Sequence, residues 1–167
     1  MTDVWVVTGV PGTGKTTLST HLGKKMGLPV LHSTELVEKY HLGKWHPKEK
    51  EYEVDTIQLK KKILSLIPQN PKGIIIEGHL LCEITLPAKG VIVLTTLSPT
   101  LEERLQSRGY SQVKIQENLY CQETNYCQKK ARKNYPHTPI LVLDTQTPKK
   151  VIYPSLMKWI KQIQRGK

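Results

Sequence analysis

Short runs of apolar, mostly β-branched residues alternate along this chain with stretches that mix apolar and polar residues. The apolar runs predict strands, at residues 4–8, 29–32, 73–76, 90–95 and 139–144. The mixed stretches predict helices, at residues 14–26, 35–40, 55 to about 67, 98–108, 111–133 and 148–164. The apolar runs at 73–76 and 90–95 are almost uninterrupted, as parallel strands covered on both faces usually are. The alternation therefore predicts an α/β fold with a doubly wound five-stranded parallel sheet and helices on both of its faces.

No internal repeat, low-complexity tract or long linker interrupts this alternation, so residues 1–167 are expected to form a single domain. Residues 41–53 differ from the rest because they are polar and contain Gly43 and Pro47, which predicts a mobile excursion. In the helix that follows, we expect the buried side to carry Ile57, Ile63, Leu64 and Ile67.

The charge balance indicates the kind of partner. The chain has 25 Lys and Arg against 14 Asp and Glu, a formal net charge of +11. A field of this sign favours anionic partners such as nucleotides, RNA or an acidic protein tail. A lysine-rich surface that only meets solvent is the alternative. The densest clusters of cations, at residues 60–62 and 129–133, favour an anion-binding face.

The cysteines and the hydropathy limit the cellular setting. Cys82, Cys121 and Cys127 form no C-x-x-C pair, and they do not combine with the histidines at zinc-ligand spacing. We therefore expect no structural metal and a reducing compartment, the cytoplasm or, in a eukaryote, the nucleus. No apolar run approaches the roughly 20 residues of a membrane span, so we expect no membrane partner.

Residues 9–16 match the phosphate-binding pattern G-x-x-x-x-G-K-[ST] in full, between a predicted strand and a predicted helix. Gly12 and Gly14 let the backbone curl so that its N–H groups face a phosphate chain. Lys15 supplies a positive charge for the β- and γ-phosphates, and the Thr16 hydroxyl is placed to hold Mg²⁺. The helix N-terminus adds its own positive end. The segment therefore predicts a P-loop that binds a nucleoside triphosphate with Mg²⁺.

What the chain lacks narrows the class of P-loop protein. Guanine-specific GTPases usually carry an Asn-Lys-x-Asp segment on a later strand, and this sequence has none. Large motor ATPases need a much longer chain. The small kinase-like branch of the P-loop proteins remains.

Two later segments add candidate catalytic groups. Glu77 ends the third predicted strand, from which its carboxylate can reach the Mg²⁺ shell or an attacking water, and His79 could orient that water or take a proton near neutral pH. Arg104 and Arg108 are one helical turn apart, so they share a face from which they can bind nucleotide and neutralise charge on the transferred phosphoryl group. The alternatives are a capped strand end, a packed histidine and a solvated basic helix end.

In this order the segments resemble the adenylate-kinase-like nuclear ATPase family, which includes the human coilin-interacting nuclear ATPase and its archaeal relatives. The resemblance covers most of the chain. It is carried by Thr8-Gly9-x-Pro11-Gly12-x-Gly14-Lys15-Thr16-Thr17, Glu77-Gly78-His79-Leu80, Glu103-Arg104-Leu105-x-x-Arg108-Gly109-Tyr110, Lys114-Ile115-x-Glu117-Asn118 and Leu143-Asp144-Thr145. The Arg-Gly-Tyr segment with the Lys-Ile-x-Glu-Asn segment after it is the most specific part, because many proteins share the P-loop.

The resemblance implies a site and a biological role. It implies ATP binding at Gly12, Gly14, Lys15, Thr16, Thr17 and Arg108. It also implies a monophosphate-binding region at about residues 32–55 and a lid at about residues 107–117. Members of this family are described as adenylate kinases and ATPases that assist late maturation of the small ribosomal subunit. The implied partners are thus ATP, ADP, AMP and a small-subunit ribosomal protein, and the basic charge adds rRNA as a further candidate.

Two arginines that clamp the AMP phosphate in orthodox adenylate kinases are missing. Glu35 is followed by Leu-Val-Glu, with no Arg three residues on, and Glu77-Gly-His-Leu-Leu stands in place of Asp-Gly-Phe-Pro-Arg. Lys39 or Lys44 could substitute, although one ammonium group fits phosphate less well than an arginine fork.

Three functions therefore stay open. The first is a Mg²⁺-dependent ATPase with adenylate or nucleoside-monophosphate kinase activity, used in ribosome assembly. The second is an assembly factor whose binding to ribosomal protein or RNA is switched by ATP. The third is a kinase for another small acceptor, such as a nucleoside or a sugar.

Overall fold

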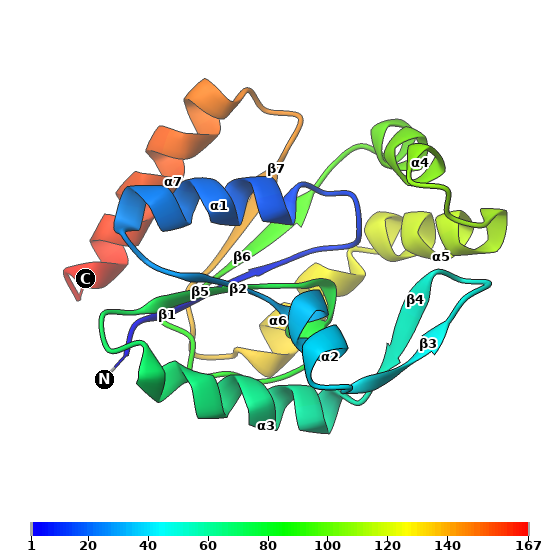
Figure 1. The fold of residues 1–167 in the computed structure, drawn as a ribbon. Coiled ribbons are helices and arrows are strands. Elements are labelled where there is room, and N and C mark those ends of the chain that lie inside the picture. The colour runs from blue at the N-terminus through cyan, green and yellow to red at the C-terminus, as the bar shows by residue number, and fades with distance from the viewer. Residues whose placement is uncertain (1, 167) are drawn as a thin grey trace.

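The computed structural model describes residues 2–166 and is built around one five-stranded sheet (Figure 1). Its strands are β1 (Val4–Thr8), β2 (Val30–His32), β5 (Ile74–Glu77), β6 (Gly90–Thr95) and β7 (Ile140–Asp144). They lie in the order β2-β5-β1-β6-β7, and every neighbouring pair is parallel. The predicted parallel sheet is confirmed, and each strand begins and ends within one residue of its expected range.

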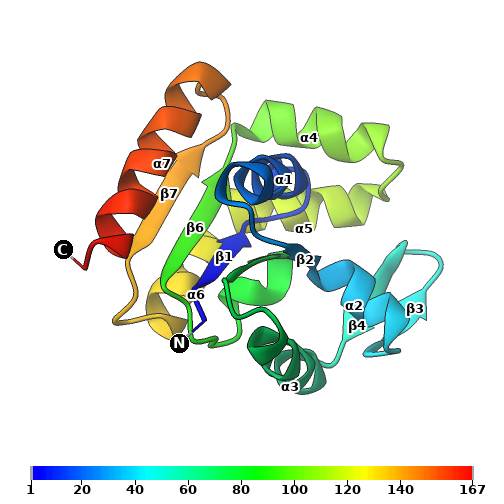
Figure 2. The same ribbon diagram turned by 60° about the vertical axis from the view of Figure 1, so that its left-hand side comes forward.

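Helices cover both faces of the sheet, as Figures 1 and 2 show. They are α1 (Lys15–Met26), α2 (Ser33–Lys39), α3 (Thr56–Leu66), α4 (Ser98–Ser107), α5 (Gln112–Glu123), α6 (Tyr126–Asn134) and α7 (Lys149–Gln164). Successive residues of a strand point to opposite faces, so Trp5 and Val7 pack with α1 and α7, whereas Val4 and Val6 pack with α3, α5 and α6. The uninterrupted apolar runs are thus buried on both sides.

Because all five strands are parallel, their carboxyl ends meet at one edge of the sheet. The Gly-rich loop leaves this edge after the central strand β1, while Glu77 ends the neighbouring strand β5 and His32 ends β2 beyond it. Ligands of open α/β sheets bind at this edge, where the connections diverge to opposite faces. The fold therefore gathers there residues that lie far apart in the sequence.

Residues 43–54, which include most of the segment expected to be a mobile excursion, form a two-stranded hairpin. Strands β3 (Gly43–His46) and β4 (Glu51–Val54) pair antiparallel beside α2 (Figure 2). Trp45 faces Tyr52 across the pair, with ring centroids 4.9 Å apart. Gly43 permits the close approach of the strands, because a Cβ at this position would lie 2.6 Å from the carbonyl oxygen of Glu53.

Two expectations about helices are wrong. The helix expected at 111–133 is two helices, because Asn125 adopts a left-handed conformation with φ 54° and separates α5 from α6. In α3 the buried side carries Leu59 and Ile63, one helical turn apart, whereas Ile57 is 68% exposed and Leu64 is 38% exposed. Ile63 and Ile67 are buried as expected.

Trp5 is fully buried within β1 and meets the edge of the Trp159 ring on α7, with centroids 6.1 Å apart. The absence of a side chain at Gly90 makes room for both rings, because a Cβ there would lie within 3 Å of each. Across residues 2–166 no helix has both the length and the apolar character needed to cross a membrane.

Candidate functional site

The loop between β1 and α1 has the curled backbone that phosphate binding requires. Gly12 and Gly14 have φ values of 89° and 94°, in the left-handed region that side chains disfavour. A Cβ at Gly12 would also lie 2.9 Å from the Leu101 side chain of α4. Inside the loop, the Thr13 hydroxyl donates to the Val10 carbonyl oxygen at 2.8 Å and braces the curl.

Lys15, the first residue of α1, folds its side chain back under this loop. Its ammonium nitrogen donates to the carbonyl oxygen of Val10 at 3.1 Å. Burial of the ammonium lowers the pKa of Lys15 from 10.5 to about 8, and the charge of Glu77 offsets only part of this effect. The ammonium group is therefore protonated at neutral pH although its buried surroundings disfavour the charge. A phosphate chain would supply the missing counter-charge.

Thr16 and Glu77 meet at the carboxyl edge although 61 residues separate them in the chain. The Thr16 hydroxyl donates to Glu77 Oε1 at 3.3 Å, and His32 Nδ1 donates to the same oxygen at 2.7 Å. Glu77 is buried, and these two contacts hold its carboxylate in place. A hydroxyl and a carboxylate oxygen are hard donors that suit Mg²⁺, and a P-loop site leaves the other positions to phosphate and water. The residues present therefore fit the expected ion.

His79 lies in the short 3₁₀ turn His79–Cys82 that follows β5, under the start of the P-loop. Its Nδ1 donates to the carbonyl oxygen of Gly9 at 3.1 Å, which leaves Nε2 as an acceptor. Burial of the ring and the charge of Lys15 lower the pKa of His79 from 6.5 to about 4. The ring is therefore neutral at neutral pH, and in this form it can orient a hydroxyl group or a water.

One candidate arginine lies on α4 and the other directly follows this helix. The Arg104 guanidinium donates to the Gly12 carbonyl oxygen at 2.9 Å, and Arg108 follows at the end of the helix. Both line a cavity of about 430 Å³, here called the α7 cavity, together with Gly12, Gly14, Thr17, Thr145, Lys149, Ile152 and Tyr153. The structure thus brings together five of the residues that the sequence assigned to nucleotide binding.

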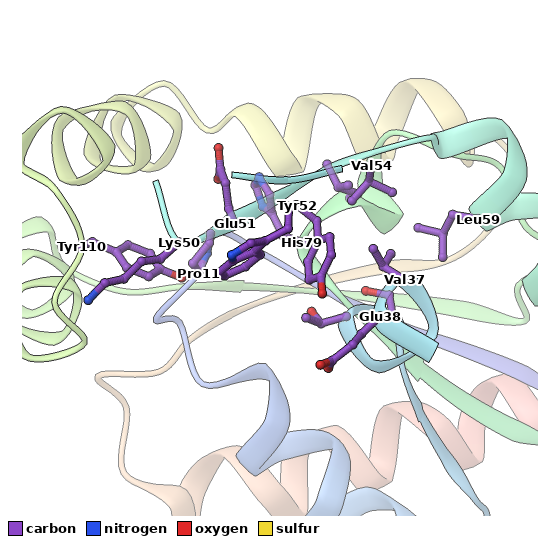
Figure 3. A pocket seen from close by; sticks show the side chains of 14 residues that line it. Pro11, Val37, Glu38, Lys50, Glu51, Tyr52, Val54, Leu59, His79 and Tyr110 are labelled. Carbon is purple, nitrogen blue, oxygen red and sulfur yellow. The ribbon is translucent and has the colours of Figure 1, made fainter. Parts of the chain in front are cut away.

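A second cavity, of about 680 Å³, opens on the other side of the P-loop (Figure 3). It is called the hairpin cavity here because Trp45, Lys50, Glu51, Tyr52 and Val54 of the hairpin line it, with Pro11, Ser33, Thr34, Val37, Glu38, Leu59, His79, Leu80 and Tyr110. Figure 3 shows Val37, Val54 and Leu59 together at one end and Lys50 beside Tyr110 at the other. One end of the cavity is thus mainly apolar, with Glu38 beside Val37, and the other end carries Lys50 with Glu51 close to it.

The cation in this cavity is not one of those that the sequence suggested. Lys39, Lys44 and Lys50 are all exposed, and of the three only Lys50 lines the hairpin cavity. Among the lining residues that the structure describes, Lys50 is the one Lys or Arg. It stands at the hairpin turn with φ 51°, the left-handed conformation that often closes such turns.

The sequence singled out several other lining residues only as part of a region or not at all. Trp45 and Tyr52 lie in the monophosphate-binding region of about residues 32–55 that the resemblance implied, and they reach the hairpin cavity because the hairpin folds. Lys149 and Tyr153 had no signal and reach the α7 cavity because α7 returns beside α1. The family resemblance did include the segment Leu143-Asp144-Thr145, and Thr145 lines the α7 cavity.

Comparisons with known proteins agree with this geometry. A family model described as "AAA domain" matches residues 6–125, more than half of the chain. A protein of Methanocaldococcus jannaschii named "Putative adenylate kinase" is 34% identical over 123 residues, which cover 72% of this chain and 67% of that protein. The "Adenylate kinase isoenzyme 6 homolog" of Caenorhabditis elegans is 31% identical over 146 residues, covering 85% of this chain and 79% of that protein. The alignments span 62% to 67% of the length of three archaeal relatives.

Solved structures show the same fold. A crystal structure titled as a putative kinase from Chloroflexus aurantiacus superposes with a TM-score of 0.63 and 21% identity, covering 96% of this chain and 97% of the other. The matched segment, the two cavities and the relatives lead to one conclusion. The chain belongs to the adenylate-kinase-like family of P-loop phosphotransferases, within the wider AAA domain family.

Proposed function

We propose that this protein is a Mg²⁺-dependent phosphotransferase of the adenylate kinase type, which converts ATP and AMP into two ADP. The observation that carries the proposal is the position of the P-loop between two cavities. Gly12 and Gly14 line the α7 cavity, and Pro11 lines the hairpin cavity. In-line phosphoryl transfer needs a donor and an acceptor on opposite sides of the transferred group, and this arrangement supports such a placement.

On the donor side, ATP would lie in the α7 cavity. The backbone N–H groups of the P-loop and the N-terminus of α1 favour its phosphates. Ile152 and Tyr153 offer apolar and aromatic surface for the base, while Arg104 and Arg108 offer positive charge. When bound with ATP, Mg²⁺ would neutralise charge on the phosphate oxygens, and Thr16 and Glu77 are the residues that would hold it.

At the reacting centre, Lys15 and Arg108 would stabilise the charge that spreads over the transferred group. Lys15 is already charged and buried, so its interaction with an anion strengthens where water is excluded. Arg104 is tied to the Gly12 carbonyl, which makes it a brace for the loop as well as a charge. In transfer to AMP the nucleophile is a phosphate oxygen, which needs no base, so Nε2 of His79 would accept a hydrogen bond only from water or from the hydroxyl of another acceptor.

On the acceptor side, AMP would place its base at the apolar end of the hairpin cavity and its phosphate near Lys50. The aromatic rings of Trp45 and Tyr52 supply a surface on which a base can stack. Lys50 Nζ lies close to the turn after α4, since a Cβ at Gly109 would be 3.0 Å from it. The phosphate would thus lie between the hairpin and the segment that carries the arginines.

Hydrolysis of ATP is a second activity that one observation favours. The hairpin cavity offers a single ammonium group and is also lined by the carboxylates of Glu38 and Glu51, where an orthodox adenylate kinase has an arginine clamp. A site that binds AMP weakly is often empty, and water can then reach the γ-phosphate of ATP. We therefore propose that the protein releases free phosphate when AMP is absent. An acceptor other than AMP, such as a nucleoside, would use the same cavity.

The cellular role is a separate part of the proposal. We infer that the protein acts in small ribosomal subunit maturation, bound to a small-subunit ribosomal protein and rRNA, in the cytoplasm or, in a eukaryote, the nucleus. Support comes from the family resemblance of residues 103–118 and from the net charge of +11. The affinity of the purified protein for small-subunit rRNA, measured once with ADP and once with Mg·ATP, tests this role. Equal affinities in the two nucleotide states would contradict an ATP-driven switch.

Replacing Lys50 with Met should raise the KM for AMP about tenfold or more, because a charge-assisted hydrogen bond to phosphate is lost while the alkyl stem stays. The rate of ATP hydrolysis without AMP should change little. Initial rates measured over a range of AMP concentrations check this. Lys44→Met is the matched control, since Lys44 is exposed on the same hairpin and does not line the cavity. An equal KM in Lys50→Met and wild type would show that AMP does not bind as proposed.

A further inference from the structure

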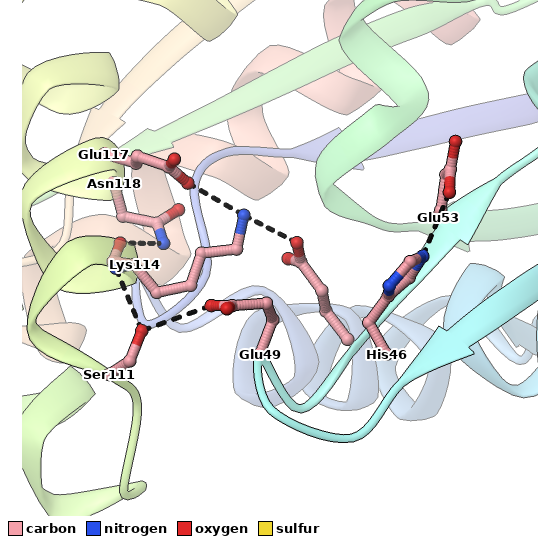
Figure 4. A network of polar contacts seen from close by, with 8 residues as sticks. His46, Glu49, Glu53, Ser111, Lys114, Glu117 and Asn118 are labelled. Carbon is pink, nitrogen blue, oxygen red and sulfur yellow. Dashed lines mark hydrogen bonds and ion pairs between the residues drawn. The ribbon is translucent and has the colours of Figure 1, made fainter.

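The tip of the hairpin is joined to the start of α5 by a small polar network (Figure 4). Lys114 Nζ lies 2.6 Å from Glu51 Oε1 on the hairpin and 2.8 Å from Glu117 Oε2 on its own helix. Beside it, the Ser111 hydroxyl donates to Glu49 Oε2 at 3.3 Å and accepts from the Lys114 backbone N–H at 3.2 Å. Ser111 caps α5, so the same side chain begins the helix and touches the hairpin.

Lys114 is shielded enough for this contact to matter. Its side chain is 20% exposed, against 46% for Glu51 and 57% for Glu117. Burial alone would lower the pKa of Lys114, but hydrogen bonds and charge from Glu117 and Glu51 outweigh it and raise the pKa above its ordinary value. Lys114 therefore stays charged, and two carboxylates from different elements share it.

The two ends of the hairpin are held differently. At its base, the Asp55 N–H donates to the Leu42 carbonyl oxygen at 2.9 Å, and Leu42 is buried in the core. Over residues 47–51, the side-chain hydrogen bonds and ion pairs to other elements within the described chain are those made with Ser111 and Lys114. The hairpin is thus fixed to the core at its base and to α5 at its tip.

The contact also joins the two sides of the site. Glu51 lines the hairpin cavity, as does Tyr110, which immediately precedes the cap of α5. The turn at Gly109, with φ 72°, connects α5 to α4 and hence to Arg104 and Arg108 in the α7 cavity. Movement of the hairpin away from α5 would therefore open the hairpin cavity and break the network at the same time.

We propose that Lys114 is a positioning residue that latches the acceptor hairpin to the lid segment through Glu51, so that the two close over the reacting groups together. This inference rests on the proposed function, because it assigns an acceptor to the hairpin cavity. The latch lowers the KM for AMP by favouring the closed hairpin. It also limits hydrolysis, because a closed cavity keeps water from the transferred phosphoryl group.

A double-mutant cycle with Lys114→Met and Glu51→Gln tests the latch. Each single change should raise the KM for AMP about fivefold, the effect of one partly shielded ion pair, and should raise the phosphate released per AMP phosphorylated. The double variant should have about the same KM as either single variant, because the contact is already lost. Any direct effect of the Glu51 charge on AMP would persist in the Lys114→Met background, so the cycle separates the two.

Glu117→Gln is the matched control, since Glu117 binds the same ammonium group but lies on α5 and does not reach the hairpin. Its KM should stay within about twofold of wild type. Hydrogen exchange of the amides of residues 43–54 provides a readout that needs no turnover. Exchange should rise in both single variants at Lys114 and Glu51 and stay unchanged in Glu117→Gln.

Different outcomes test the Lys114–Glu51 latch and the proposed transfer to AMP. Independent, multiplying effects on KM, or unchanged hairpin exchange in Lys114→Met, would overturn the latch. If the wild-type protein transfers nothing to AMP, the proposed function fails, and the exchange experiment still decides whether Lys114 holds the hairpin.

Discussion

Lys15→Met should abolish most ATP turnover, with kcat falling roughly 100- to 1,000-fold, as expected when one preorganised cation is removed from a transition state. The ammonium group lies under the P-loop, 3.1 Å from the Val10 carbonyl, where ATP would bring its β- and γ-phosphates. Met keeps a flexible unbranched stem, one atom shorter than that of Lys, and removes the charge together with the donor that binds the Val10 carbonyl. Steady-state kinetics with Mg·ATP, with and without AMP, measure the loss.

The same change should stabilise the nucleotide-free protein. The pKa of Lys15 is lowered from 10.5 to about 8, so below pH 8 both the folded and the unfolded chain carry the proton and the folded state bears the full cost of burying it. At pH 7 the cost is on the order of 3 kcal/mol. Between pH 8 and 10.5 the folded protein releases the proton first, and the cost disappears. The free energy of unfolding of Lys15→Met should therefore exceed that of wild type at pH 7, and the difference should shrink toward pH 10.5.

Lys24→Met serves as control, because Lys24 is exposed in the last turn of the same helix. It should change neither turnover nor the pH dependence of stability. Wild-type-like turnover in Lys15→Met would contradict the assignment of the P-loop as the catalytic centre. A stability difference independent of pH would contradict the buried charge.

Glu77→Gln should lower kcat by about 100-fold and raise the concentration of Mg²⁺ needed for half-maximal rate. The carboxylate accepts from the Thr16 hydroxyl and from His32, so the amide keeps the shape but loses the charge that would hold the ion and orient its neighbours. Rates measured in a Mg²⁺ titration at saturating ATP check both effects.

Glu83→Gln is the matched control for this change. Glu83 lies six residues after Glu77 and accepts from the Tyr126 hydroxyl at 2.8 Å, away from the P-loop. Its Mg²⁺ titration should match that of wild type. If Glu77→Gln behaves in the same way, the carboxylate does not belong to the Mg²⁺ site.

The parts of the site that sequence analysis located are those set by local backbone chemistry. A strand, a Gly-rich turn and a helix specify the P-loop, and uninterrupted apolar runs specify buried parallel strands, so Lys15, Thr16 and Glu77 could be assigned to one edge. The helical spacing of Arg104 and Arg108 placed both on one face, and both line the α7 cavity.

Local backbone chemistry did not locate the individual residues of the acceptor side, because its hairpin is held by pairing across strands; the family resemblance implied only its region, at about residues 32–55. Its turn has no Asn-Gly or Asp-Gly signal, and Lys50 takes the left-handed conformation instead. With the strands unrecognised, the pairing of Trp45 with Tyr52 and the entry of Lys50 into a cavity had no signal. The break at Asn125 escaped notice for a similar reason, since a single left-handed Asn interrupts a helix without Gly or Pro.

The most direct test of the central claim is to incubate the purified protein with Mg·ATP, with and without AMP, and to quantify ATP, ADP, AMP and free phosphate together. The account predicts that added AMP is consumed, that two ADP form for each AMP, and that phosphate release is slow and falls as AMP rises. Phosphate release that is indifferent to AMP, with no AMP consumed, would contradict the assignment of the hairpin cavity as the acceptor site.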